Sequence, residues 1–86
     1  MQIRLSADLW ANGVLPLGFL ERWRANEGDQ VLEGAPLAEV RIEQAVHEIL
    51  SPCRGRLTGI VRENAVVEPG DVIGQVEPVE SAAPSI

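Results

Sequence analysis

Apolar residues alternate with polar ones along this chain with a period of two, in short runs separated by Gly, Pro, Asn or Asp. That alternation is typical of β-strands with one buried face, whereas an amphipathic helix repeats about every 3.6 residues. The pattern predicts an all-β domain with eight strands, at residues 2–5, 18–25, 30–32, 36–42, 45–51, 55–62, 66–68 and 72–77. The segment Ser6–Leu17, between the first two strands, is predicted to be a long loop.

The stretch from Gly18 to Val40 is matched by the stretch from Gly55 to Val76, which predicts an internal duplication. Val31, Gly34, Leu37 and Val40 recur 36 residues later as Val67, Gly70, Ile73 and Val76, and Gly18, Leu20 and Trp23 recur 37 residues later as Gly55, Leu57 and Ile60. Gly28 corresponds to Asn64, and both residue types tolerate positive φ. Two such halves would pack sheet on sheet about a quasi-twofold axis. The expected fold is a flattened barrel or sandwich of two small antiparallel sheets.

The predicted domain covers residues 1–77, and the Pro-, Ser- and Ala-containing stretch 78–86 is predicted to be a flexible tail or the start of a linker. Glu43 and Gln44 lie where the two halves meet, between the predicted strands 36–42 and 45–51. We therefore expect them to form the tip of a tight hairpin with Ala45. The chain ends are expected at the opposite pole of the domain.

The charge balance argues against nucleic acid as a partner, because thirteen carboxylates outweigh seven arginines to give a net charge of -6. Cys53 is the only cysteine, so neither an intrachain disulfide nor a cysteine-based zinc site can form. A single cysteine fits a reducing compartment and predicts a cytoplasmic protein. The longest mostly apolar stretch, Val14–Leu20, is far shorter than the roughly 20 residues that span a bilayer, so no membrane association is expected.

The arrangement of glycines and apolar residues resembles the lipoyl-domain family, the swinging-arm carriers of 2-oxo acid dehydrogenase complexes, which share a fold with biotin carboxyl carrier domains. The resemblance covers about residues 9–76 and is carried by Gly18, Leu20, Trp23, Glu27, Gly28, Asp29, Val31, Gly34, Leu37 and Val40, followed by Glu48, Ser51, Pro52 and Gly55. The hairpin that in the family reads Glu-Thr-Asp-Lys-Ala reads here Arg41-Ile42-Glu43-Gln44-Ala45. Biotin domains typically place Met on both sides of the lysine, so Glu43 and Ala45 resemble the lipoyl branch, the 2-oxo acid dehydrogenase acyltransferase type.

Gln44 stands where the resemblance places the modified lysine, and the chain contains no lysine at any position. Lipoylation and biotinylation both join a carboxylic acid to a nucleophilic primary amine, which among side chains only lysine supplies. The amide nitrogen of Gln44 is conjugated with its carbonyl and is not nucleophilic. The sequence therefore predicts that no lipoyl or biotin is carried on a side chain.

Nothing else in the sequence indicates catalysis, and the protein is not expected to be an enzyme. His47 has no Cys or His partner near it, so a surface histidine is favoured over a metal ligand or a general base, and no metal site is expected. Cys53 lies in a turn beside Arg54 and is expected to be a half-buried, inert thiol.

In lipoyl domains the loop after the first strand lies beside the modified lysine and helps the partner enzyme to recognise the domain. The resemblance therefore implies a recognition surface made by the loop Ala7–Leu17 and the hairpin tip, with Leu9, Trp10, Asn12, Glu43 and Gln44 as candidate contact residues. Trp10 has two readings: it packs over the end of the barrel, or it is presented to a partner.

Three functions are compatible with these residues. In the first, the chain is a non-catalytic, lipoyl-like interaction module whose partners are proteins, with 2-oxo acid dehydrogenase components as the candidates that the resemblance implies. In the second, it is a swinging-arm acyl carrier whose lysine was substituted, in the laboratory or in a divergent copy beside a functional domain. In the third, it is a scaffold β-domain of a larger assembly, against which the Glu43-Gln44-Ala45 tip counts.

Overall fold

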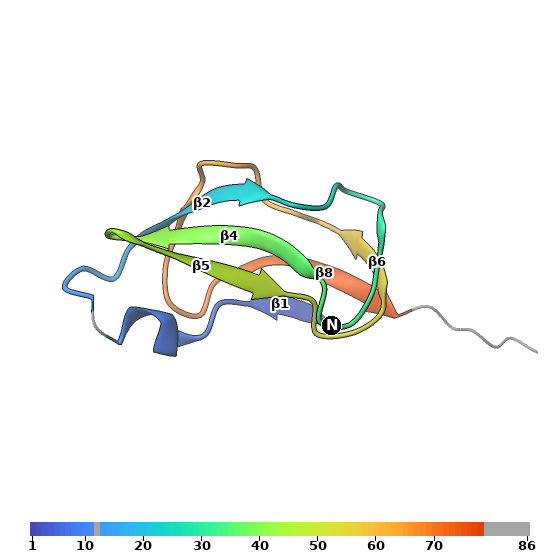
Figure 1. Cartoon of the computed structure of the whole chain (residues 1–86), viewed down its shortest axis with the longest axis horizontal. Helices are drawn as coiled ribbons and strands as arrows, with labels where there is room; N and C mark the ends of the chain where they lie inside the picture. The colour runs from blue at the N-terminus through green and yellow to red at the C-terminus, as the bar shows by residue number, and fades with distance from the viewer. Residues whose placement is uncertain (12, 79–86) are drawn as a thin grey trace, which may run out of the picture.

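The computed structural model describes residues 1–11 and 13–78, which form two antiparallel four-stranded sheets packed face to face (Figure 1). The strands are β1 (Gln2–Arg4), β2 (Gly18–Trp23), β3 (Gln30–Val31), β4 (Pro36–Ile42), β5 (Ala45–Leu50), β6 (Gly55–Thr58), β7 (Val66–Val67) and β8 (Val72–Pro78), and one 3-10 helix, η1 (Ala7–Trp10), follows β1. One sheet has the order β1-β8-β6-β3 and the other β5-β4-β2-β7. The predicted fold class is confirmed.

The two sheets have equivalent strand orders. By the sequence match, β4, β2 and β7 correspond to β8, β6 and β3, and each set occupies the same three places in its own sheet, with β5 or β1 at the edge. Backbone hydrogen bonds repeat in the same way. Leu20 N donates to Ala65 O at 2.9 Å, and Leu57 N donates to Asp29 O at 2.9 Å. Whether this equivalence arose by duplication stays a prediction.

The turns also match, and they show why particular residue types occur there. Gly28 and its counterpart Asn64 have φ values of 88° and 69°, in the left-handed region that most side chains avoid. The N–H of Gly28 donates to Leu57 O, and the N–H of Asn64 donates to Leu20 O, both at 2.7 Å. The turn at Gly28 is therefore hydrogen-bonded to β6, and the turn at Asn64 is hydrogen-bonded to β2, so each turn contacts the other half of the domain.

The core lies between the inner faces of the two sheets and contains side chains from both. Its largest fully buried side chains are Leu5, Leu20, Leu37, Leu57, Ile73, Val40 and Val76. Gly18 and Gly55 begin β2 and β6, and neighbouring atoms approach both closely, leaving a tight fit for a Cβ at Gly18 and no room for one at Gly55. A Cβ on Gly55 would clash with the backbone of Glu77, which explains why glycine occupies the start of that strand.

Two of the predicted strands extend two or more residues beyond the observed ones, and hydrogen bonds to glutamate side chains lie where these two strands end. The strand predicted over 55–62 ends at Thr58, because Gly59 has a φ of 63° and the N–H groups of Gly59 and Ile60 donate to Glu27 instead of to a strand. The strand predicted over 18–25 ends at Trp23, whose N–H donates to Glu63. The remaining strand bounds agree within one residue.

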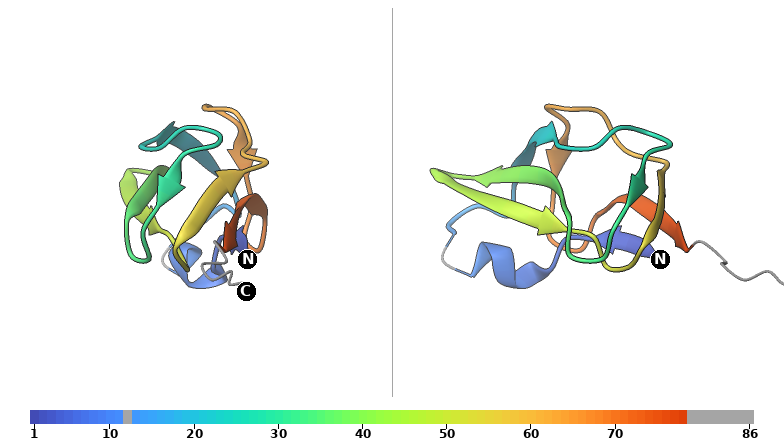
Figure 2. Two further views of the ribbon diagram at one scale, coloured as in Figure 1. Left: turned by 90° about the vertical axis from the view of Figure 1, so that its right-hand side faces the viewer. Right: turned by 45° about the vertical axis from the view of Figure 1, so that its right-hand side comes forward.

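The N-terminus and the end of β8 lie at the pole opposite the β4–β5 hairpin (Figures 1 and 2). The amino group of Met1 donates to Val76 O at 2.7 Å, which fixes the start of the chain beside β8. Strand β8 extends to Pro78, one residue into the predicted tail, and residues 79–86 lie outside the described part of the chain. Within the described residues, no helix has the length and apolar character needed to cross a membrane.

Candidate functional site: the hairpin tip and the loop beside it

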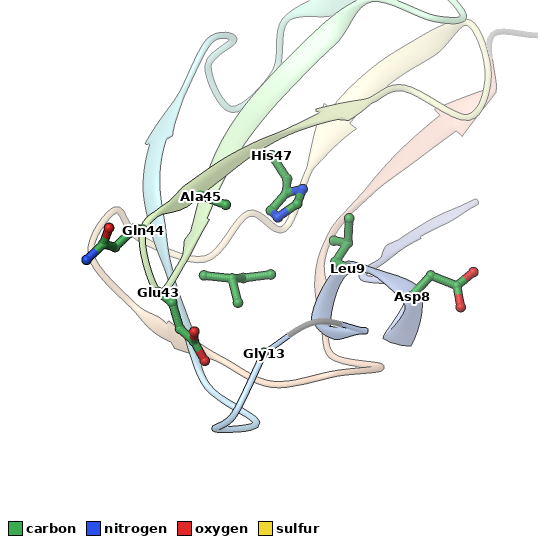
Figure 3. Close-up of a pocket in the computed structure, with 8 residues that line it drawn as sticks. Asp8, Leu9, Gly13, Glu43, Gln44, Ala45 and His47 are labelled. Atoms are coloured by element: carbon green, nitrogen blue, oxygen red, sulfur yellow. The ribbon is translucent and has the colours of Figure 1, made fainter.

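Glu43 and Gln44 form a two-residue turn, because Ile42 of β4 pairs directly with Ala45 of β5. Glu43 occupies the left-handed region with a φ of 57°, an unusual conformation for a residue with a long side chain. Gln44 is exposed at the tip, and its side chain points away from the rest of the domain (Figure 3). The predicted hairpin tip is therefore observed, with the amide of Gln44 as its outermost group.

The side chain of Glu43 turns in the other direction and holds the loop that precedes β2. Its carboxylate Oε2 accepts hydrogen bonds from the backbone N–H groups of Val14 at 2.6 Å and Leu15 at 3.4 Å. Gly13 passes so close that an added Cβ would lie 3.3 Å from the same oxygen. These contacts join the hairpin tip to a loop 28 to 29 residues away in sequence.

Trp10, one of the predicted recognition residues, is a core residue and offers no indole ring to a partner. Only 7% of its surface is exposed, and its Nε1–H donates to Leu17 O at 3.1 Å. Helix η1 brings Trp10 under the loop, and Ser6 stabilises the start of that helix by accepting a hydrogen bond from the N–H of Asp8 at 3.1 Å. The packing alternative for Trp10 is therefore correct, and the presentation alternative is wrong.

The loop segment that Glu43 holds is apolar and exposed. Val14 is 86% exposed, and Leu15 and Leu17 are also exposed. Exposed apolar residues that follow one another along a chain are a common feature of protein-binding surfaces. These side chains lie beside the hairpin tip because of the Glu43 hydrogen bonds, so the tip and the loop form one surface.

A hollow of about 380 Å³ separates the hairpin from η1 and the loop (Figure 3). It is lined by Asp8, Leu9, Gly13, Ile42, Glu43, Gln44, Ala45 and His47. Leu9 and His47 face each other across it, while the carboxylate of Asp8 points away (Figure 3). The lining combines apolar and polar residues in equal number, and no arginine lines the hollow.

The structure brings together three of the five predicted recognition residues. Leu9, Glu43 and Gln44 line the hollow or its rim, Trp10 lies in the core, and Asn12 lies outside the described residues. The predicted recognition loop Ala7–Leu17 contains Val14 and Leu15, but neither was among the five candidate contact residues. Their signal was the apolar run Val14-Leu15-Pro16-Leu17, in which proline and the neighbouring glycine indicate an exposed loop.

His47 and Cys53 show no catalytic arrangement. His47 is half-buried in β5, and the half-buried thiol of Cys53 lies 3.9 Å from Val76 O. Among residues 1–11 and 13–78, the structure has no group of three or more His, Cys, Asp or Glu side chains that could hold a metal ion.

Comparisons with known proteins give the following matches. Residues 14–76 match the model of the biotin/lipoyl family, which is described as biotin-requiring enzyme. Acetyl-CoA carboxylase of Dictyostelium discoideum is 30% identical over 60 residues, which cover 70% of this chain and about 3% of that much longer protein. The solution structure of the lipoyl domain of the 2-oxoglutarate dehydrogenase complex from Azotobacter vinelandii superposes with a TM-score of 0.68 at 21% identity, covering 87% of this chain and 95% of that domain.

Proposed function

Because this chain belongs to the biotin/lipoyl family, we propose that it is a lipoyl-like module without an attachment residue that acts by binding other proteins. Domains of this family are carriers and have no catalytic activity of their own. The observation that carries the proposal is Gln44, which is exposed at the two-residue turn where the family resemblance places the attachment lysine.

The residues present do not fit a covalently attached lipoyl or biotin. Attachment to a side chain requires a primary amine, and the sequence contains none. The N-terminal amino group of Met1 lies at the opposite pole and donates to Val76 O. A two-residue turn with no nucleophilic amine at its tip supports the part of our proposal that the chain carries neither cofactor.

The geometry beside the tip supports a protein as the partner. Val14 and Leu15 form an exposed apolar segment that the Glu43 carboxylate holds next to Gln44. Small molecules usually bind in enclosed, mostly apolar sites, whereas an exposed apolar segment beside an open hollow fits a side chain from another protein. Among proteins, 2-oxo acid dehydrogenase components are our first candidates, because Glu43 and Ala45 flank Gln44 as in the lipoyl branch and because the fold matches a lipoyl domain. We place this function in the cytoplasm, on the evidence of the single cysteine.

A second candidate function is a carrier whose lysine was substituted, and the intact turn favours it. One experiment separates the two functions. The chain and its Gln44→Lys variant are each incubated with lipoate ligase, lipoate and ATP, and with biotin ligase, biotin and ATP, and their intact masses are measured. The wild-type chain should keep its mass, and a covalent adduct on it would overturn the proposal. An unmodified Gln44→Lys variant supports a repurposed module, whereas an adduct on Lys at this position supports the substituted carrier.

The binding surface is tested separately by titrating the labelled chain with purified 2-oxo acid dehydrogenase components and following its backbone amide signals. We expect the signals of Val14, Leu15 and Gln44 to change, and the Val14→Ser variant to weaken the binding. Leu32→Ser is the matched control, because Leu32 is also exposed but lies in the β3–β4 turn, away from the hairpin tip. Equal loss of binding in both variants would show that the tip surface is not the site.

A further inference from the structure

A row of four cross-strand neighbours runs over the whole width of the β5-β4-β2-β7 sheet. Val46 pairs with Arg41, Arg41 with Phe19, and Phe19 with Val66. Residues directly opposite each other in antiparallel strands have their side chains on the same face. The next pair in β2 and β4, Leu20 and Val40, is buried, so the row lies on the outer face.

This row exposes apolar side chains to solvent. Phe19, the only phenylalanine of the chain, is 48% exposed, and Val66 and Val46 are 58% and 47% exposed. Between them, Arg41 is held by Glu21 through a hydrogen-bonded ion pair of 2.8 Å. The row is therefore an apolar band over three strands, with one arginine whose charge is compensated.

The equivalent row of the other sheet is polar, which shows that the fold does not require apolar residues here. In the β1-β8-β6-β3 sheet, Arg56 pairs with Glu77 and with Gln30. By the internal repeat, Arg56 corresponds to Phe19 and Gln30 corresponds to Val66. The same backbone positions therefore carry solvated residues on one sheet and apolar residues on the other, so the apolar band has a cause other than folding.

The charges around the band are balanced, unlike those on the rest of the chain. Arg22, Arg24 and Arg41 form ion pairs with Glu21, Glu39 and Glu48, and these are all the ion pairs found among the described residues. The charges of these three arginines and three glutamates sum to zero. The remaining residues therefore carry the whole net charge of -6. Two copies of the chain would therefore repel each other less when they meet through this face than through the others.

We propose that the outer face of the β5-β4-β2-β7 sheet is a self-association surface whose occupant is a second copy of this chain. A twofold interface requires a patch that complements itself, and a neutral face with equal numbers of arginines and glutamates around an apolar band meets that requirement. Four strands about 4.8 Å apart and up to seven residues long give a face of roughly 400 Å² in projection. A face of this size predicts a weak, reversible dimer, and the inference does not depend on the partner proposed for the hairpin tip.

Sedimentation velocity of the 86-residue chain from micromolar to millimolar concentration tests the inference. We expect a concentration-dependent shift from monomer to dimer. High salt should strengthen the dimer, because it screens the repulsion between two chains of net charge -6 and the proposed interface is itself neutral. Amide signals of Phe19 and Val66 should move on dilution.

The double variant Phe19→Arg, Val66→Gln should raise the dissociation constant by about tenfold or more, since it removes the centre of the band. It introduces the residues that Arg56 and Gln30 place at the equivalent positions, so the fold should be retained, which circular dichroism checks. The matched control is Val72→Gln, which removes an exposed apolar side chain from the other sheet and should leave the dimer unchanged. A wild-type chain that stays monomeric at millimolar concentration in high salt would overturn the inference, as would equal weakening by the control.

Discussion

Glu43 and Gln44 are neighbours in the turn of the β4–β5 hairpin, but they have opposite environments. The carboxylate of Glu43 folds back onto the backbone of Val14 and Leu15, whereas the amide of Gln44 has no such contact and points outward. A short side chain at residue 43 would release the loop, but residue 44 can change without disturbing any packing. Residue 44, where the resemblance places the attachment lysine, is therefore an exposed position at which the fold requires no particular side chain.

At this residue scale, Gln44→Ala should change the free energy of unfolding by less than about 0.5 kcal/mol, as exposed positions usually do. The reason is that no core contact or hydrogen bond is lost at the tip. Urea denaturation followed by tryptophan fluorescence measures the change. A loss of several kcal/mol would mean that Gln44 is packed against another part of the protein, and the lipoyl interpretation of the tip would fail.

A second residue-scale prediction concerns Glu21 and Arg41. The hydrogen bond from the Arg41 guanidinium holds the pKa of the Glu21 carboxyl below its ordinary value, and partial desolvation opposes this shift without cancelling it. Since the pKa is lower in the folded state, the pair contributes stability above the ordinary pKa of glutamate, and that contribution is lost as the pH falls through the lowered pKa. Both side chains are exposed, so the contribution is small.

An NMR titration of the Glu21 side-chain carbon should therefore give a midpoint below that of an ordinary glutamate. In the Arg41→Gln variant the midpoint should rise toward the ordinary value, because the main cause of the shift is removed. Arg62→Gln is the control, since Arg62 lies in the loop between β6 and β7 and should leave the Glu21 titration unchanged. An ordinary pKa for Glu21 in the wild-type chain would contradict the predicted ion pair.

At the scale of elements, strand ends are set by side chains from the other half of the domain. Glu27 accepts hydrogen bonds from the N–H groups of Gly59 at 3.0 Å and Ile60 at 3.2 Å, beyond the end of β6. Its counterpart 36 residues later, Glu63, accepts from Trp23 N–H at 2.9 Å, at the end of β2. Each half therefore terminates a strand of the other half, and these reciprocal contacts join the two sheets outside the core.

Glu27→Ala should accordingly lower the free energy of unfolding by about 1 kcal/mol, a typical net value for hydrogen bonds that solvent can partly replace. Glu63→Ala should cost no more than Glu27→Ala, because it removes one such bond instead of two. Denaturant unfolding measures both, and faster hydrogen exchange at the Gly59 and Ile60 amides should accompany the first. The exposed Glu33 provides the control, and Glu33→Ala should be close to neutral. A Glu27→Ala variant as stable as this control would show that the contacts contribute nothing.

These contacts also show what the sequence could not predict at the element scale. Apolar residues continue past Thr58, at Ile60 and Val61, and past Trp23, at Ala25, so the sequence alone predicts longer strands than those observed. The strands end where a glutamate from a distant segment takes over the N–H groups, and a distant partner leaves no local signal. Trp10 is a similar case, because its burial depends on a 3-10 helix that no periodicity within Ser6–Leu17 indicates.

At the scale of the whole molecule, the sequence predicted the architecture well because the matched stretches 18–40 and 55–76 provide a second constraint on β2, β3, β4, β6, β7 and β8. The all-β class, the two antiparallel sheets and the hairpin between the halves were all accessible from matched apolar positions and matched glycines. The exposed apolar band around Phe19 could not be predicted in this way. It is recognised only when Arg56 and Gln30 are seen at the equivalent positions of the other sheet. To predict which side chains lie next to each other on a sheet surface, the register between strands must be known, and the composition of the chain does not give it.

The last prediction concerns the symmetry of the core. Leu20 and Leu57 occupy equivalent positions, both are fully buried, and their N–H groups make equivalent 2.9 Å hydrogen bonds to Ala65 and Asp29. Leu20→Ala and Leu57→Ala should therefore destabilise the domain by similar amounts, roughly 2 to 4 kcal/mol each, since each leaves a cavity in the same core. Parallel urea unfolding of the two variants measures the difference. If one variant unfolded the domain while the other were near neutral, the two sheets would not contribute equally to the core, and the functional comparison between their outer faces would lose its basis.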